Sequence, residues 1–64
     1  MSADNGLIVR LDDERYKVFE YNASTGSEWQ LTTFRTLEQA VRYAQQFQTE
    51  NVVEYGISFD LERV

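Results

Sequence analysis

One stretch of this 64-residue chain has the period of an amphipathic helix, whereas the segments around it have the composition or the period of strands. Thr36 and Gln39 match a capping box, and Glu38 and Arg42 form an i,i+4 pair on the polar side. The apolar stripe consists of Leu37, Ala40, Val41, Ala44 and Phe47. The pattern therefore predicts a single helix after Thr36, which we expect Asn51 to end in the left-handed conformation.

Four segments are typical of strands. Residues 6–11, 15–21 and 29–34 are rich in β-branched and aromatic side chains, and turn-forming residues separate them. Residues 53–61 alternate strictly between apolar and polar side chains, which predicts a half-buried strand. The predicted element order is βββαβ.

This order limits the topology. Short connections make the first three strands antiparallel, and a right-handed crossover through the helix places the fourth strand parallel to the first. We therefore predict a single α+β domain over residues 1–64, with a four-stranded mixed sheet in the order 3-2-1-4. One helix covers only one face of such a sheet, so the second face meets water or a partner.

The predicted register decides what that second face presents. A two-residue turn at Asp12 and Asp13 places Leu11 opposite Glu14. With this parity the helix side carries Leu7, Val9, Leu11, Tyr16 and Val18. In the second hairpin we expect Tyr21 opposite Trp29 and Phe19 opposite Leu31, so the far face carries Ile8, Phe19, Tyr21, Trp29 and Leu31. Such a cluster either stabilises a thin sheet by cross-strand pairing or forms a protein-binding or homodimer surface.

The residue types argue against most enzyme and metal chemistry. The chain has neither Cys nor His, and carboxylate pairs such as Asp12 with Asp13 or Asp60 with Glu62 are expected to be solvated charges. We expect no catalytic site, cofactor or metal. Eleven acidic residues against six basic ones give a net charge of -5, which disfavours direct binding of nucleic acid. No targeting or membrane segment is expected, which indicates a cytoplasmic protein.

The two ends of the chain carry a resemblance. Residues 2–9, Ser-Ala-Asp-Asn-Gly-Leu-Ile-Val, and residues 54–57, Glu-Tyr-Gly-Ile, resemble the corresponding segments of small proteins encoded by bacteriophages and prophages. The resemblance implies an accessory gene and the cytoplasm of a host cell. Small acidic phage proteins as a class often bind host proteins, including CRISPR effectors, sometimes by presenting carboxylates in place of DNA phosphates.

Two functions follow as hypotheses. The first is an anti-CRISPR-like inhibitor that mimics DNA and occupies a basic nucleic-acid channel on a host protein. Its candidate residues are Asp12, Asp13, Glu14, Glu54, Asp60 and Glu62. The alternative is a homo-oligomeric or structural module that associates through the aromatic sheet face. Its candidate residues are Phe19, Tyr21, Trp29 and Leu31.

Overall fold

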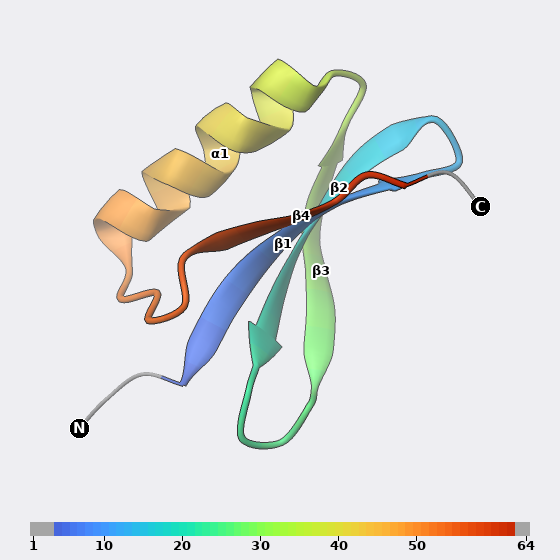
Figure 1. The fold of residues 1–64 in the computed structure, drawn as a ribbon. Helices are drawn as coiled ribbons and strands as arrows, with labels where there is room; N and C mark the ends of the chain where they lie inside the picture. Colours follow the sequence, from blue (N-terminus) through green and yellow to red (C-terminus); the bar gives the residue numbers. More distant parts are fainter. Residues whose placement is uncertain (1–3, 63–64) are drawn as a thin grey trace.

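A computed structural model describes residues 4–62 of the chain. In chain order its elements are β1 (Asn5–Asp12), β2 (Arg15–Asn22), β3 (Glu28–Phe34), α1 (Leu37–Glu50) and β4 (Ile57–Asp60). The four strands form one sheet in the order β3-β2-β1-β4, with β1 antiparallel to β2 and parallel to β4. Helix α1 lies on one side of this twisted sheet (Figure 1). The predicted α+β architecture and strand order are confirmed.

Helix α1 begins at the predicted cap. The Thr36 hydroxyl oxygen accepts a hydrogen bond from the Gln39 backbone N–H at 3.2 Å, and the hydroxyl donates to Gln39 Oε1 at 3.2 Å. The predicted left-handed end is wrong, because Asn51 is extended, with φ -133°. Instead its backbone N–H and its side-chain amide both donate to the Phe47 carbonyl oxygen, at 2.9 and 3.1 Å. These bonds satisfy a terminal carbonyl without the left-handed conformation.

The core between the helix and the sheet is small. Its fully buried members are Leu7, Val9, Val18, Ala40 and Ala44. The two alanines leave room for α1 to approach the sheet closely. Tyr43, which the predicted stripe omitted, packs against this core; Tyr43 and Val41 are both half-buried. The Tyr43 ring lies between two others, with centroids 5.7 Å from Phe34 and 6.4 Å from Phe47.

The first hairpin turns one residue later than predicted. Asp12 pairs with Arg15, so the two turn residues are Asp13 and Glu14, with φ of 52° and 60°. Positive φ at both central positions is the signature of a type I′ turn. The resulting shift of two residues in the pairing preserves its parity, because side chains alternate with period two. The predicted helix-side residues of β1 and β2 therefore keep their face.

The second hairpin contains a β-bulge, which the sequence analysis did not predict. Val18 pairs with Thr32, but the next residue, Phe19, pairs with Gln30. Leu31 is the extra residue on β3, so the predicted pair of Phe19 with Leu31 is wrong. A bulge of this kind disrupts the ladder locally and moves the following side chains by one position.

The bulge changes the face of two apolar side chains. Leu31 packs against the core beneath α1. Trp29 pairs with Glu20, instead of the expected Tyr21, and Glu20 in turn pairs with the core residue Leu7. Trp29 and Leu31 therefore lie on the helix side of the sheet, and their predicted position on the far face is wrong.

Strand β4 is shorter than the alternation predicted. Only residues 57–60 pair with β1, whereas residues 54–55 form a turn and Gly56 has φ 69°. Val53 still packs against the core from this connection. Of the N-terminal segment that carried the resemblance, residues 2 and 3 lie outside the described residues.

Candidate functional site

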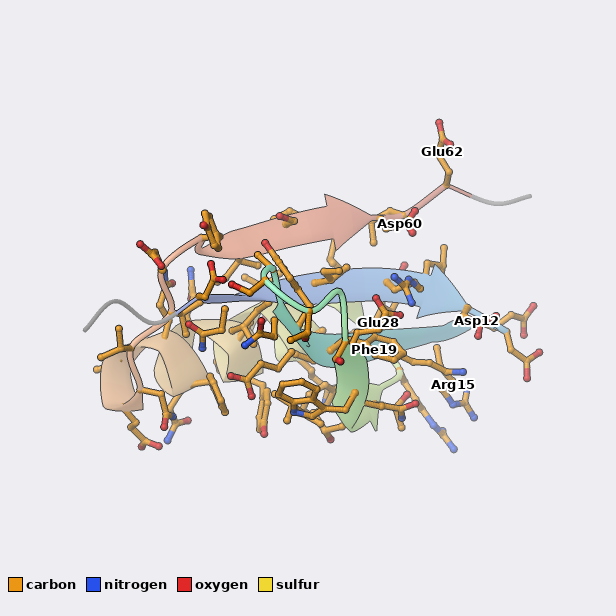
Figure 2. All side chains as sticks on the ribbon, turned by 90° about the horizontal axis from the view of Figure 1, so that it is seen from below. Asp12, Arg15, Phe19, Glu28, Asp60 and Glu62 are labelled. Atoms are coloured by element: carbon orange, nitrogen blue, oxygen red, sulfur yellow. The ribbon has the colours of Figure 1, made fainter. Side chains whose placement is uncertain are left out.

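Five of the six carboxylates singled out from the sequence lie at one end of the sheet. Because β1 and β4 are parallel, their carboxyl ends lie at the same end. Asp12 is the last residue of β1 and Asp13 and Glu14 form the turn after it, whereas Asp60 is the last residue of β4 and Glu62 follows that strand. We call these five residues the acidic end. Figure 2 shows Asp12, Asp60 and Glu62 toward the same end of the molecule.

The sixth carboxylate, Glu54, does not join this group. It lies before β4, in the connection from α1, and its backbone N–H is 3.4 Å from Oδ1 of Asn5 at the start of β1. The prediction that Glu54 shares a strand with Asp60 and Glu62 is wrong. The positive φ of Gly56 interrupts the extended segment that would have carried all three.

Internal cations neutralise part of the acidic end. Lys17 Nζ lies 2.9 Å from Asp12 Oδ2, and this hydrogen bond, aided by the charge attraction, lowers the pKa of Asp12. Arg10 Nε lies 3.4 Å from Asp60 Oδ2. Asp13 and Glu14 are exposed and form no ion pair with any residue between 4 and 62. Glu62 is likewise exposed and forms no ion pair within residues 4–62, so Asp13, Glu14 and Glu62 present the unpaired carboxylates of the acidic end.

The open face of the sheet is built around Arg10. Its Nη1 lies 2.9 Å from Glu28 Oε1 on β3, and its guanidinium carbon lies 4.7 Å from the centroid of the Phe19 ring on β2. The Glu28 hydrogen bond raises the pKa of Arg10, and the same bond lowers the pKa of Glu28. Phe19 and Glu28 lie next to each other in Figure 2. No local sequence pattern indicates this network, although Arg10 stands at a far-face position of the period-two pattern.

The four residues of the predicted aromatic face do not form one surface. Phe19 and Tyr21 lie on the open face as predicted, but both are half-buried. Arg10 covers Phe19, and the Tyr21 ring lies so close over Gly6 that a methyl group there would overlap it. Trp29 and Leu31 are on the other side. The open face is therefore a layer of charge over aromatic rings.

Large apolar side chains are exposed elsewhere. Phe59 on β4 and Tyr55 before it are each 53% exposed, and Trp29 on β3 is 44% exposed. Tyr55 donates its hydroxyl to Asp4 Oδ1 at 3.1 Å, and this bond raises the pKa of Tyr55. Phe59 and Trp29 belong to the two edge strands of the sheet. The alternating pattern places Phe59 on the helix side, and the predicted order 3-2-1-4 already places its strand at an edge.

Comparison of the chain with protein-family models, with curated proteins and with solved structures finds no match. Over residues 4–62, no helix is both long and apolar enough to cross a membrane. In the same part of the chain, no three potential metal ligands among His, Cys, Asp and Glu come close enough together to hold an ion.

Proposed function

We propose that this protein binds a basic surface on a partner protein through its acidic end. The observation that carries the proposal is the parallel pairing of β1 with β4, which brings Asp60 and Glu62 to the end of the sheet that carries the Asp13–Glu14 turn. Carboxylates from two segments far apart in sequence thus occupy one surface. Complementary charge of this kind raises association rates and selects partners.

The internal ion pairs favour a cationic partner. Arg10, Lys17 and Arg42 are each held by carboxylates of the chain itself, whereas Arg15 and Arg35 form no ion pair within residues 4–62. The net charge is -5, so the negative field is compensated only in part. A partner with clustered Lys and Arg side chains gains the most from this field. The nucleic-acid channel of a host protein has that chemistry, and phosphate mimicry is the mode that the resemblance to phage proteins implies.

The conformation of the turn supports the same proposal. Asp13 and Glu14 occupy fixed left-handed conformations in a tight hairpin turn. Carboxylates on such a turn lose less conformational freedom on binding than they would on a flexible tail. The inhibitor hypothesis follows: a chain that occupies such a channel prevents nucleic acid from entering it, as an anti-CRISPR-like protein would.

The homo-oligomeric alternative through the open sheet face has less support. Arg10 covers Phe19, and Trp29 and Leu31 belong to the other side of the sheet. Association through this face would have to bury the charges of Glu28 and Asp60 next to the rings, at a desolvation cost.

The test compares two variants that lose the same charge. Asp13→Asn with Glu14→Gln neutralises the turn, whereas Glu38→Gln with Glu50→Gln neutralises two exposed helix positions. Immobilised wild type is expected to retain nucleic-acid-binding proteins from a bacterial lysate, and added salt or duplex DNA is expected to release them. The turn variant should lose this capture and the helix variant should keep it. Equal capture by both variants, or capture that resists salt and DNA, would contradict the proposal.

A further inference from the structure

Strand β3 is an edge of the sheet, and its backbone alternation shows which groups face outward. The Asn22 N–H donates to the Ser27 carbonyl oxygen at 2.8 Å, so Ser27 faces β2. Because every second residue of an antiparallel strand faces the neighbouring strand, Glu28 and Gln30 turn their backbone groups away from β2. Beyond the bulge, Thr33 lies between Thr32 and Phe34, which lie opposite residues of β2. The same alternation therefore turns the backbone groups of Thr33 outward.

We propose that a second copy of this chain docks on β3, antiparallel to it, and that the two sheets become one across a two-fold axis between Leu31 and Thr32. This register pairs Gln30 with Thr33 of the second copy, so outward backbone groups meet outward backbone groups. It also brings Glu28, which contacts Arg10 of its own chain, opposite Arg35 of the second copy, twice by symmetry; Arg35 lies in the bend directly after β3. Opposite charges across a strand pair are favourable, and this arrangement is self-complementary.

The bulge is what permits this register. In a regular strand, two residues separated by an odd number of positions point to opposite faces and cannot oppose each other in an antiparallel pair. The extra residue Leu31 shifts the alternation by one, so that Trp29 and Phe34 both point to the helix side. Trp29 of one copy then lies opposite Phe34 of the other.

The apolar side chains near this edge fit the same partner. Trp29 is 44% exposed in the single chain, on the same side of the sheet as α1. Phe34 belongs to the aromatic row that continues to Tyr43, with centroids 5.7 Å apart, and then to Phe47. In the dimer both helices lie on one face of the joined sheet, and the two Trp29 rings are covered by Phe34 and its neighbours. Burial of exposed aromatic side chains is a main source of binding energy at interfaces.

This dimer is independent of the proposed function. The acidic end lies at the turn between the interior strands β1 and β2 and after β4, whereas the dimer uses the outward edge of β3. Loss of one therefore does not imply loss of the other.

The experiment measures the mass of the full chain by sedimentation over a concentration series, with Trp29 emission recorded in parallel. We expect a monomer–dimer equilibrium in which emission shifts to the blue, and acrylamide quenches it less, as the dimer forms. Thr33→Pro removes an outward N–H that the single chain does not need, and should keep the protein monomeric. Thr33→Val retains that N–H and is expected to dimerise.

Reversal of the charge at Arg35 provides a second test that does not introduce a proline into the strand. Arg35→Glu places like charges opposite each other at both ends of the interface, and should weaken dimerisation about tenfold or more. Arg35→Gln removes the attraction without adding a like charge, and is expected to weaken dimerisation less than Arg35→Glu. A wild-type chain that stays monomeric at about 1 mM, or a dimer that Arg35→Glu does not weaken, overturns the proposal. Association only with a different protein would overturn it as well.

Discussion

The guanidinium carbon of Arg10 lies 4.7 Å from the centroid of the Phe19 ring. The same side chain contacts Glu28 on β3 and Asp60 on β4, which are the two edge strands of the sheet. One residue of the interior strand β1 thus connects both edges across the open face. Its position over an aromatic ring adds a cation–π contact to the two ion pairs. This layer covers the face that the sequence analysis expected to be apolar.

The Arg10 network predicts that the protein loses stability in acid. Arg10 lowers the pKa of Glu28 from its ordinary value of 4.5, and Lys17 lowers that of Asp12 from 3.8. Because the unfolded chain takes up these protons first, the stabilisation is complete above the ordinary values and is lost as pH falls through the lowered ones. The free energy of unfolding in urea, measured from neutral pH to about pH 2, should therefore decline below about pH 4.5.

Replacement of Arg10 provides the control. Arg10→Gln should make the acid dependence of the unfolding free energy shallower, because Glu28 then titrates near its ordinary value. Arg15→Gln removes the same charge from a residue that has no ion pair within residues 4–62, and is expected to leave the dependence as in the wild type. Equal acid dependence in the Arg10 variant and the wild type would show that the network contributes nothing.

The β1–β2 turn predicts a stabilising substitution. Glu14 adopts φ 60°, a conformation that costs a residue with a Cβ atom about 1 kcal/mol and costs glycine much less. Glu14→Gly should raise the melting temperature by roughly 4–8 °C, because about 1 kcal/mol is a large part of the stability of so small a domain. Glu14→Ala removes the charge but keeps the Cβ atom, and should give no such rise. An equal gain in both variants would assign the effect to charge.

Most of the fold could be predicted from the sequence because its main signals are local. The period of three and four with the Thr36 cap defined α1, and short turn-forming segments defined the order of the strands. The predicted face of each residue in β1 and β2 is correct, even though the predicted turn lies one position too early. A shift of the turn changes the pairing by two residues, and a change of two preserves the face.

The bulge and the site depend on tertiary contacts that the sequence does not display. Leu31 leaves the ladder and packs against the core, and no glycine marks this position. The grouping of Asp60 with Asp13 followed from the predicted parallel pairing of β1 and β4, whereas the loss of Glu54 from the group depends on the turn at Gly56. Arg10 reaches three other strands through a long side chain, which strand patterns do not describe.

The small core makes Ala44 a sensitive position. Ala44 is fully buried on the sheet-facing side of α1, so Ala44→Asp would place a carboxylate in a core cluster of apolar side chains. We expect a cost of several kcal/mol against a total stability of roughly 5 kcal/mol, and hence an unfolded chain by circular dichroism. Gln45→Asp introduces the same carboxylate at the next, exposed position and should remain folded. A cooperative melt of Ala44→Asp near the wild-type temperature would mean that the buried face is assigned incorrectly.

The two segments that carry the resemblance to phage proteins contact each other in the fold. The Tyr55 hydroxyl donates to Asp4, and the Tyr55 backbone N–H donates to the Asn5 carbonyl oxygen at 3.0 Å. Next to them, the Leu7 N–H donates to the Gly56 carbonyl oxygen at 2.9 Å. The start of β1 thus holds the connection between α1 and β4 in place, which gives both segments a structural role.

Asn5 is the side chain on which this contact most depends. Its Nδ2 donates to Glu20 Oε2 at 2.9 Å and to the Val52 carbonyl oxygen at 3.0 Å, so both partners are acceptors. Asn5→Asp replaces the donor with a third acceptor that carries a charge like that of Glu20. We therefore expect Asn5→Asp to lower the free energy of unfolding at neutral pH by about 1–3 kcal/mol, and by more than Asn5→Ala.

A second substitution separates the loss of the hydrogen bonds from general damage to the strand. In the Asn5→Asp protein, Glu20→Gln supplies an amide that donates to the new carboxylate, and should recover part of the lost stability in urea unfolding. In the wild type, Asn5 Nδ2 is itself the donor to residue 20, so a new amide donor there brings no gain. Glu20→Gln alone is therefore expected to be neutral or slightly destabilising. A coupling energy near zero in this double-mutant cycle would show that Asn5 and Glu20 do not interact in solution. A positive coupling would identify their hydrogen bond as the contact that ties β2 to the start of β1 at this corner of the sheet.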